Sequence, residues 1–474
     1  MRGESPRGPA ALYFAAAGIL FLIAIATQFE LYVPSRPVGA VAEIQALPQL
    51  QHSEGPLNVV FILIDTLRAD RSSTYGYERQ TTPVIDDLAR YGVVFERVVS
   101  QSSWTKASMA SLWTGMLPAR SGIHHYDHVL PDEAVMAAEL FQAAGYRTAG
   151  IYRNGWVAPN FGFAQGFDVY LRPAPGRDQI LVRRQNPSRH PLRGSDMDLL
   201  LSAREFLARF GGERFFLYVH MMDLHQYVFD QDVVDFGPSY SDAYDKALNW
   251  TDRVVGRLVQ EIDELGLLDR TLIAIAADHG EAFQEHGSEG HAKNLHAEVT
   301  NVPFVIAFPF RLDPGIRVRA RIANVDIWPT LLELVGLGVL PEADGVSQVP
   351  RILEAAGASP ETESLERPIF AQLERHWGRP SAPRRPLAAV TDGSLRLLAD
   401  TTNRKADRLY DLSADPGETR NLADERPREA AALGALLGEY LESSEPPWGA
   451  EQPVVELQEL ELNQLRALGY RIGN

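Results

Sequence analysis

The chain has 474 residues, and its 45% content of hydrophobic residues, typical of a globular protein, excludes disorder for most of its length. Its formal net charge of −17 argues against nucleic-acid binding, because a phosphate backbone attracts basic proteins. The chain contains no cysteine, which excludes disulfides, thiolate zinc sites and cysteine nucleophiles together.

The N-terminus carries an uncharged apolar segment. Residues 1–9 include Arg2 and Arg7, and residues 10–29 that follow carry no charge. About 20 apolar residues suffice to cross a bilayer as a helix, and arginines before such a segment favour a cytoplasmic N-terminus. We therefore predict a transmembrane anchor at 10–29, with the remainder of the chain exported to the periplasmic or extracellular side. A cleaved signal peptide, with Ala24-Ile25-Ala26 as its cleavage motif, is the alternative and also exports the chain.

A linker and a large α/β domain are expected next. Residues 30–56 contain four prolines without a regular period, which predicts a spacer. Between residues 57 and 345, apolar runs typical of buried strands alternate with amphipathic segments typical of helices. This alternation predicts a large, mostly parallel sheet with helices on both faces. The expected strands are 58–64, 147–152, 214–220, 271–277 and 302–308, and the expected helices are 82–91, 107–114, 132–144, 196–209 and 242–265.

The pattern changes in the C-terminal part of the chain. Within residues 346–442, short runs separated by turns predict a small antiparallel-sheet subdomain that ends with a helix at 425–441. The expected strands of this subdomain are 368–372, 387–391, 395–398 and 409–412. Residues 443–474 contain three prolines and form a tail that we expect to pack loosely.

Two of the predicted strands end in metal-ligating residues. Strand 58–64 is followed by Asp65, and strand 271–277 is followed by Asp278 and His279. Open α/β sheets place their chemistry at the carboxyl ends of parallel strands, so these side chains are expected to meet at one edge. Carboxylate oxygens and an imidazole nitrogen make a compact site for a divalent cation. The pattern therefore indicates a metal-dependent enzyme.

A hydroxyl suited to nucleophilic attack lies between these two strands in the sequence. Thr105 directly precedes the predicted helix 107–114. The amide groups and positive dipole end of a helix N-terminus stabilise an attacking alkoxide and a transferring oxyanion. Contact with a cation would lower the pKa of the hydroxyl and make Thr105 a nucleophile near neutral pH. The alternative is that Thr105 is only a helix N-cap.

Several separated motifs together resemble those of the sulfatase family within the alkaline phosphatase superfamily. They occur in order over nearly all of residues 57–440, at 65–70, 75–77, 105–118, 216–225, 278–281, 286–291, 324–330, 409–418 and 421–422. The resemblance implies one large mixed sheet flanked by helices, a small C-terminal sheet and the hydrolysis of ester bonds.

The resemblance also implies roles for individual residues. The metal ligands fall at four positions, Asp65, Thr105, Asp278 and His279. Thr105 also occupies the position of the nucleophile, while His225 and His291 contact the anionic group of the substrate or protonate its leaving oxygen. Lys106 helps to balance the substrate's charge. One divalent cation is expected, and His286 with Asp223 are the candidates for holding a second one.

The chain departs from the family pattern at positions that bear on its substrate. Family members that cleave sulfate esters carry Cys or Ser, converted to formylglycine, where this chain has Thr105, and Arg where it has Met109. The paired acids after the first strand are reduced to Asp65-Thr66, which favours manganese, magnesium or zinc over calcium. With these departures the chain resembles the branches of the superfamily that transfer phosphorus-containing groups.

Three functions are compatible with these patterns. The leading interpretation is a membrane-anchored, exported, metal-dependent hydrolase of phosphoric or sulfuric esters on a small-molecule, lipid or glycan substrate. The second is a transferase that moves a phospholipid head group to an acceptor. The third is an inactive protein that binds an anionic glycan or lipid, and loss of the family's Arg and second Asp is its support.

Overall fold

The computed structural model describes residues 57–176, 181–183, 193–358, 367–375, 386–443, 445–449 and 451–467. The anchor predicted at 10–29 and the linker predicted at 30–56 lie outside these residues. In the part of the chain that is described, none of the helices has the length and apolar character that a membrane span requires.

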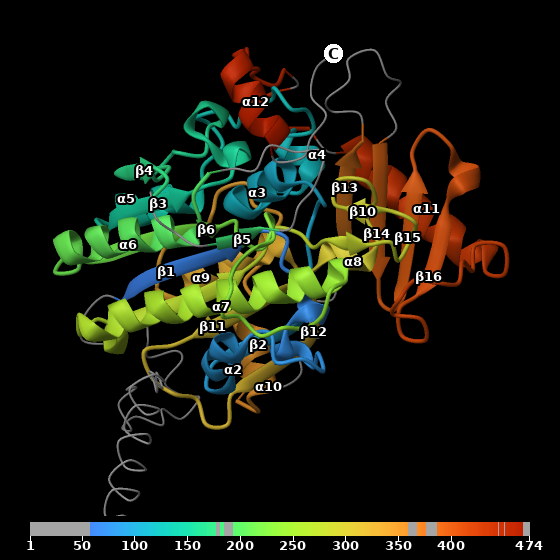
Figure 1. Ribbon diagram of the computed structural model, residues 1–474. Helices are drawn as coiled ribbons and strands as arrows, with labels where there is room; N and C mark the ends of the chain where they lie inside the picture. Colours follow the sequence, from blue (N-terminus) through green and yellow to red (C-terminus); the bar gives the residue numbers. More distant parts are fainter. Residues whose placement is uncertain are drawn as a thin grey trace, which may run out of the picture. The chain divides into compact units, whose positions relative to one another are not determined.

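An eight-stranded sheet forms the centre of the larger part of the molecule, in the order β12-β2-β11-β8-β1-β6-β3-β4 (Figure 1). Its strands are β1 (Asn58–Ile64), β2 (Val93–Val99), β3 (Arg147–Tyr152), β4 (Val169–Leu171), β6 (Phe215–Met221), β8 (Thr271–Ala276), β11 (Asn301–Ala307) and β12 (Ile316–Ala323). Strand β1 lies between β6 and β8 and is parallel to both. Among the described strands of this sheet, β11 alone runs antiparallel to its neighbours. The prediction of a large, mostly parallel sheet is therefore confirmed.

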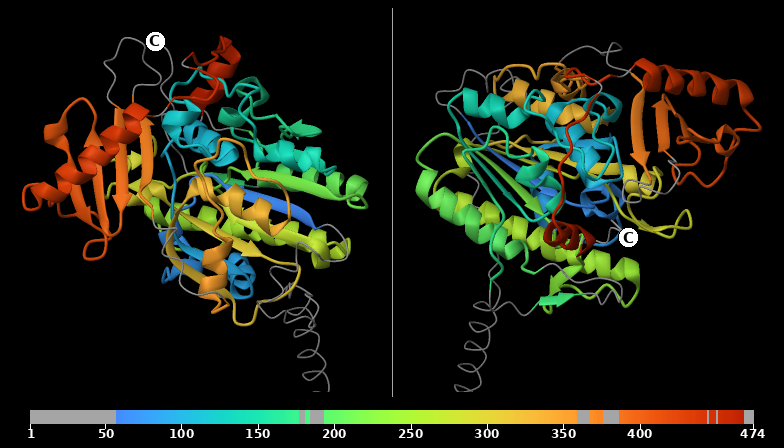
Figure 2. Two further views of the ribbon diagram at one scale, coloured as in Figure 1. Left: turned by 180° about the vertical axis from the view of Figure 1, so that it is seen from behind. Right: turned by 90° about the horizontal axis from the view of Figure 1, so that it is seen from above.

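Helices cover both faces of this sheet (Figure 2). On one face α2 and α6 each pack against α7, and on the other α3 packs against α5 and α9. The helices of this part are α2 (Pro83–Arg90), α3 (Thr105–Thr114), α4 (Pro118–Ser121), α5 (Ala137–Ala143), α6 (Asp196–Phe210), α7 (Tyr240–Glu264), α8 (Ala297–Thr300), α9 (Ile327–Leu334) and α10 (Val349–Ala355). Two short two-stranded antiparallel sheets complete it, β5 (Leu181–Arg183) with β7 (Val228–Asp230), and β9 (Ala282–Phe283) with β10 (Glu289–Gly290).

Several helices begin at residues other than those predicted, and the differences at α5 and α3 have a local cause or consequence. Helix α5 begins at Ala137 instead of 132, because the Glu139 carboxylate accepts a hydrogen bond from the Met136 amide at 2.7 Å and so caps the helix there. Helix α3 begins at Thr105 instead of 107, and Trp104 takes the N-cap position. The interpretation of Thr105 as a helix N-cap is therefore wrong.

The C-terminal subdomain contains the antiparallel sheet that was predicted, with strand order β13-β14-β15-β16. The strands are β13 (Ile369–Glu374), β14 (Pro386–Asp392), β15 (Leu395–Asp400) and β16 (Arg408–Asp411), and helix α11 (Pro427–Ser443) packs on β14 and β15. Arg396 of β15 donates a hydrogen bond to Thr300 Oγ1 at 2.9 Å and so joins this sheet to the larger part.

The described part of the tail is attached by its backbone, contrary to the expectation of loose packing. The Val129 amide donates to the Pro453 carbonyl at 2.8 Å, and the Val455 amide donates to the Asp127 carbonyl at 2.9 Å. Helix α12 (Glu459–Ala467) follows, and its Leu465 is buried. Paired backbone groups and an apolar anchor hold this segment in one place.

Candidate active site

Three buried ligand side chains meet at the carboxyl edge of the sheet. Asp65 directly follows β1, and Asp278 and His279 follow β8. Because β1 and β8 are parallel neighbours, their ends lie side by side. One ligand atom of each residue lies within 4.8 Å of those of the other two. The structure thus brings together the three residues that the sequence pattern placed at one edge.

The electrostatics of this cluster favour a cation. Burial raises the pKa of Asp65 well above its usual range, and the neighbouring Asp278 carboxylate raises this pKa further. Asp65 Oδ1 and Asp278 Oδ2 are buried and accept no hydrogen bond from the part of the chain that the structure describes. Buried carboxylates are normally paired or bound to a metal ion. Two carboxylates and an imidazole therefore fit a divalent cation.

The ring of His279 is oriented by a backbone carbonyl. Its Nδ1 lies 3.0 Å from the carbonyl oxygen of Gly280, which can only accept, so Nδ1 carries a proton. In the neutral ring this leaves the lone pair on Nε2, the arrangement usual for metal-ligating histidines. Burial lowers the pKa of His279, but Asp278 and Asp65 raise it more, and the net pKa is raised. The two carboxylates therefore make the electrostatic potential at the His279 ring negative, which favours a bound cation.

Thr105, at the start of α3, presents its hydroxyl to this cluster. Its side chain is buried, and Oγ1 lies 3.0 Å from His279 Nε2. One turn later on α3, the Ser108 hydroxyl donates to the backbone carbonyl of Asp278 at 2.6 Å and fixes the helix against the end of β8. Met109, where sulfate-cleaving relatives carry Arg, is fully buried in the core.

Asn154 belongs to the site and was not singled out in the sequence. Its Nδ2 donates to Asp65 Oδ2 at 2.6 Å and lies 3.4 Å from Thr105 Oγ1, while its Oδ1 accepts from the Trp156 amide at 2.8 Å. Asn154 follows β3 by two residues, as Asp278 follows β8. A polar residue just beyond a predicted strand was the available signal.

His220, on β6, is a second residue that sequence reasoning missed. Burial lowers the pKa of His220 to about 4, so the ring is neutral at physiological pH. Its Nδ1 lies 2.7 Å from the Tyr218 hydroxyl, and its Nε2 lies 3.1 Å from Asp65 Oδ2. Asp65 Oδ2 thus receives donors from two neighbouring strands, and Oδ1 remains available for a cation.

His291 and His225 extend the site away from the metal cluster. The ring centroid of His291 lies 4.5 Å from that of His279 and 5.0 Å from that of His225. His291 Nδ1 is 2.7 Å from Glu281 Oε2, and Glu281 Oε1 accepts from the Tyr227 hydroxyl at 3.2 Å. Both histidines therefore lie beside the metal cluster, and their contact with a substrate stays a prediction.

Lys106 lies beside Thr105 in the chain but has other contacts. Its ammonium is buried, donates to the Tyr126 carbonyl at 2.8 Å and lies 3.6 Å from the centroid of the Phe161 ring. Burial lowers the pKa of this lysine well below its usual range. Among the described residues, its hydrogen bond is to a backbone carbonyl and not to the metal cluster. Its role in substrate binding stays a prediction.

The two candidates for a second cation do not join the cluster. Asp223 Oδ1 accepts from Arg153 Nη1 at 2.6 Å, and its Oδ2 accepts from the Trp250 indole at 2.8 Å. His286 Nδ1 lies 2.9 Å from Glu298 Oε1. The carboxylate of Asp223 already has cationic and neutral donors, so a second ion built from these two residues is not supported.

Comparison with known proteins places this fold and site in a family. The family model described as "Sulfatase" matches residues 57–337, and one described as "N-sulphoglucosamine sulphohydrolase, C-terminal" matches residues 285–444. Human arylsulfatase A is 27% identical over 436 residues, covering 77% of this chain and 83% of that protein. N-acetylgalactosamine-6-O-sulfatase of Bacteroides thetaiotaomicron is 23% identical over 487 residues, covering 82% and 93%.

A solved structure with the same fold is the phosphonate monoester hydrolase of Agrobacterium radiobacter. It aligns with a TM-score of 0.65 and 20% identity, covering 82% of this chain and 95% of its own. The chain belongs to the sulfatase family. It is accordingly an ester-hydrolysing enzyme, built on the fold that these proteins share.

Proposed function

We propose that this protein is a divalent-cation-dependent hydrolase that cleaves phosphoric or sulfuric esters with Thr105 as its nucleophile. The observation that carries this proposal is the position of Thr105 Oγ1, 3.0 Å from His279 Nε2 in a buried cluster. Two carboxylate oxygens without hydrogen-bond partners belong to the same cluster. A reaction centre is expected to combine a nearby hydroxyl with buried oxygens that lack hydrogen-bond partners. In a purely structural cluster, other protein groups would donate hydrogen bonds to those oxygens.

Four residues would hold the cation, namely Asp65, Thr105, Asp278 and His279. When bound, a divalent cation supplies a Lewis acid that lowers the pKa of a neighbouring hydroxyl and offsets the negative charge of the substrate. The rest of the chemistry falls to the side chains. Asn154 and His220 hold the Asp65 carboxylate in place through its Oδ2, so that this ligand needs no reorganisation.

The proposed reaction has two steps. The Thr105 hydroxyl gives its proton to solvent water, Oγ1 attacks the phosphorus or sulfur and forms a bond to that atom, and the bond to the leaving alcohol breaks. His291 or His225 donates a proton to the departing oxygen, and Glu281 orients the His291 ring through Nδ1. Water then cleaves the Thr105 ester and restores the hydroxyl. The N-terminus of α3 stabilises the negative charge that develops at Thr105.

Phosphorus esters are the favoured substrates within this proposal. Thr105 cannot be converted to formylglycine, and Met109 is a buried apolar residue where sulfate-cleaving relatives carry an arginine. The relatives named above act on aryl and sugar sulfates by their names, which supports an anionic ester of a small molecule, glycan or lipid. The cation is manganese, magnesium, zinc or calcium.

A transferase is the second candidate function. A threonine ester can be resolved by an acceptor alcohol in place of water, and a predicted membrane anchor would keep the enzyme near phospholipid substrates. We place the catalytic domain on the exported side of the membrane, because Arg2 and Arg7 precede the apolar segment and favour a cytoplasmic N-terminus. Protease accessibility of the full chain in sealed, right-side-out vesicles tests this placement. The placement is wrong if the domain is protected in these vesicles and is cleaved only after lysis.

A matched set of aryl esters tests the function. The full chain, solubilised in detergent, is assayed on 4-nitrophenyl phosphate, a phosphodiester, a phosphonate and a sulfate, with each of the four cations. Turnover of a phosphorus ester by wild type and its loss in Thr105→Ala support the proposal. Turnover that requires added glycerol supports the transferase. Equal inactivity of both proteins, with no bound metal, supports an inactive binding protein.

A further inference from the structure

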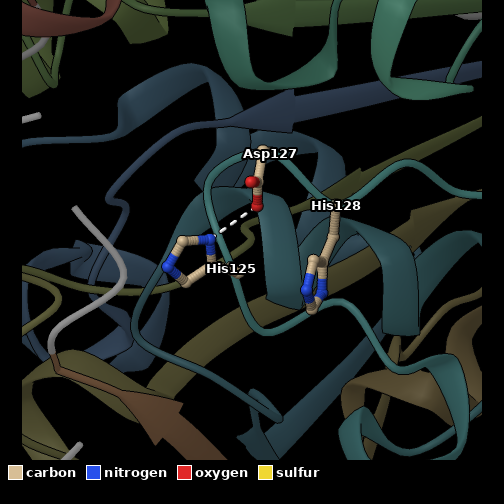
Figure 3. Close-up of side chains that lie close together, drawn as sticks. All are labelled: His125, Asp127 and His128. Carbon is tan, nitrogen blue, oxygen red and sulfur yellow. Dashed lines mark hydrogen bonds and ion pairs between the residues drawn. The ribbon is translucent and has the colours of Figure 1, made fainter. Parts of the chain in front are cut away.

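A second group of metal-ligating side chains lies outside the candidate active site, between α4 and α5. His125, Asp127 and His128 each offer one ligand atom, and these atoms lie within 4.8 Å of one another. His125 Nδ1 is 2.5 Å from Asp127 Oδ1. Figure 3 shows the two imidazoles on either side of the Asp127 carboxylate. The three residues share one short loop, so the loop alone sets their geometry.

The donor atoms of this loop cluster are available to a cation. All three side chains are partly exposed, which lets a hydrated ion reach them. His128 Nδ1 lies 2.9 Å from the Gly122 carbonyl, closer than the 3.3 Å that separates it from the His124 amide. The carbonyl contact places the proton on Nδ1 and the lone pair on Nε2. A backbone carbonyl in this position is the usual way of orienting a metal-ligating histidine.

A third group consists of His286, His296 and Glu418, and it differs from the loop cluster in having no free lone pair on the ring of His286. His286 Nδ1 lies 2.9 Å from Glu298 Oε1, and its Nε2 lies 3.1 Å from the Glu418 carbonyl oxygen. Both partners are acceptors, so both ring nitrogens donate and neither has a lone pair for a metal. Among the described residues, Nε2 of His128 makes no such bond, and the ring nitrogen of His125 that faces the cluster is Nδ1, 2.5 Å from Asp127 Oδ1 (Figure 3), so a cation would displace the proton that these two atoms share. Of these two groups, the loop cluster is therefore the better candidate for a metal site.

We propose that His125, Asp127 and His128 bind a second metal ion, separate from the one at Asp65, Asp278 and His279. Two imidazoles and one carboxylate, with a water molecule as fourth ligand, form a donor set that suits Zn²⁺. Ca²⁺ and Mg²⁺ fit less well, because they need six or more ligands that are mainly oxygen.

The loop connects this site to both the nucleophile and the tail. The backbone carbonyl of Tyr126, between the ligands, accepts the hydrogen bond from the ammonium of Lys106, the residue after Thr105. The Asp127 carbonyl accepts from the Val455 amide in the tail. An ion that fixes the loop therefore also fixes Lys106 and the docked tail. The site is structural, and it stabilises the folded chain because the ion binds only that state.

The test uses full-length protein in which the first site is removed by Asp65→Ala together with Asp278→Ala. Zn²⁺ binding is measured by titration calorimetry, and Co²⁺ is used as a spectroscopic probe of the coordination geometry. We expect one equivalent of Zn²⁺ to bind, a tetrahedral Co²⁺ absorption band, and a higher Tm with Zn²⁺. Adding His128→Gln or Asp127→Asn weakens Zn²⁺ binding at least about tenfold and removes the shift in Tm.

His124→Gln is the matched control, because it changes a histidine of the same loop that is outside the cluster. It retains the equivalent of Zn²⁺ and the shift in Tm. The proposal is overturned if the protein with an intact loop binds no Zn²⁺ saturably, a result that does not depend on the folding of any loop variant. It is equally overturned if His128→Gln and Asp127→Asn bind Zn²⁺ as tightly as their parent.

Discussion

Thr105 Oγ1 lies 3.0 Å from His279 Nε2, although 174 positions separate the two residues in the chain. Two features produce this approach. Helix α3 begins at Thr105 itself, and the Ser108 hydroxyl ties the first turn of that helix to the Asp278 carbonyl at 2.6 Å. A small shift of α3 along its axis would separate the hydroxyl from the ligand cluster, so the position of this helix decides whether the site can react.

Replacement of Thr105 by alanine removes the proposed nucleophile. We expect kcat to fall at least about 10⁴-fold, the scale on which loss of a nucleophile acts in hydrolases, while Thr105→Ser retains measurable turnover because it keeps the hydroxyl. Steady-state kinetics on the aryl esters measure both effects, and intact-protein mass spectrometry detects the covalent ester on the wild type and on Thr105→Ser. Full activity of Thr105→Ala would rule out this nucleophile.

Removal of the divalent cation abolishes activity in our proposal. After dialysis against a chelator, turnover is expected to be lost and to return on addition of Mn²⁺, Mg²⁺, Zn²⁺ or Ca²⁺. In Asp278→Asn, with one ligand charge removed, reactivation requires at least about tenfold more of the same cation. Metal content by atomic emission is measured alongside. A dialysed sample that contains no metal and keeps its activity would contradict cation dependence.

Asn154 supports the Asp65 ligand through a hydrogen bond of 2.6 Å. Its replacement by alanine leaves that carboxylate less well oriented, and we expect kcat/KM to fall about 10- to 100-fold with a matching rise in the cation concentration needed. Asn160→Ala is the control, because Asn160 contacts Glu461 at 3.1 Å in the tail and not the cluster. Equal kinetics of the two variants would remove Asn154 from the site.

His291 is one of the two histidines, with His225, that can donate the proton to the leaving alcohol in the proposed reaction. Its replacement by glutamine is expected to slow an alkyl ester about 10²-fold and a 4-nitrophenyl ester much less, because nitrophenolate leaves without protonation. Glu281→Gln, which weakens the 2.7 Å contact to His291 Nδ1, is expected to act in the same direction with a smaller size. A loss that is independent of the leaving group would exclude this role for His291.

His286 makes the stability of the fold depend on pH. Burial lowers the pKa of His286, but its contacts with Glu298 and Glu418 raise it more, so the net pKa lies above the ordinary value of 6.5. The folded state therefore holds this proton more tightly than the unfolded state. The stabilisation is complete below pH 6.5 and is lost as the pH rises through the raised pKa of the folded state.

We expect the urea midpoint of the wild type to fall over this interval, and that of His286→Gln to fall less. Measurements between pH 5.5 and 9 in the presence of a chelator separate this effect from metal binding. His124→Gln, a histidine outside the contact, should keep the slope of the wild type. A slope that is unchanged in His286→Gln would show that the proton on this ring does not contribute.

The central strands and the residues that end them could be predicted from the sequence. A run such as Asn58–Ile64 is apolar throughout because both faces of the strand are buried, and Asp65 marks its end. The same argument located Asp278 and His279 after β8. Strands β2, β4 and β12 were not predicted. In β12, arginines alternate with apolar residues, a pattern typical of an exposed strand.

The sequence by itself therefore determined the ends of strands β1, β3, β6, β8 and β11, since burial leaves a local record in the run of apolar residues. The tertiary structure decided which of those ends are neighbours. Asn154 and His220 contact Asp65 only because β3, β6 and β1 are adjacent in the sheet, and no local pattern records that order. The burial of Lys106 is likewise a long-range effect, because Phe161 and the Tyr126 carbonyl that surround its ammonium come from other segments.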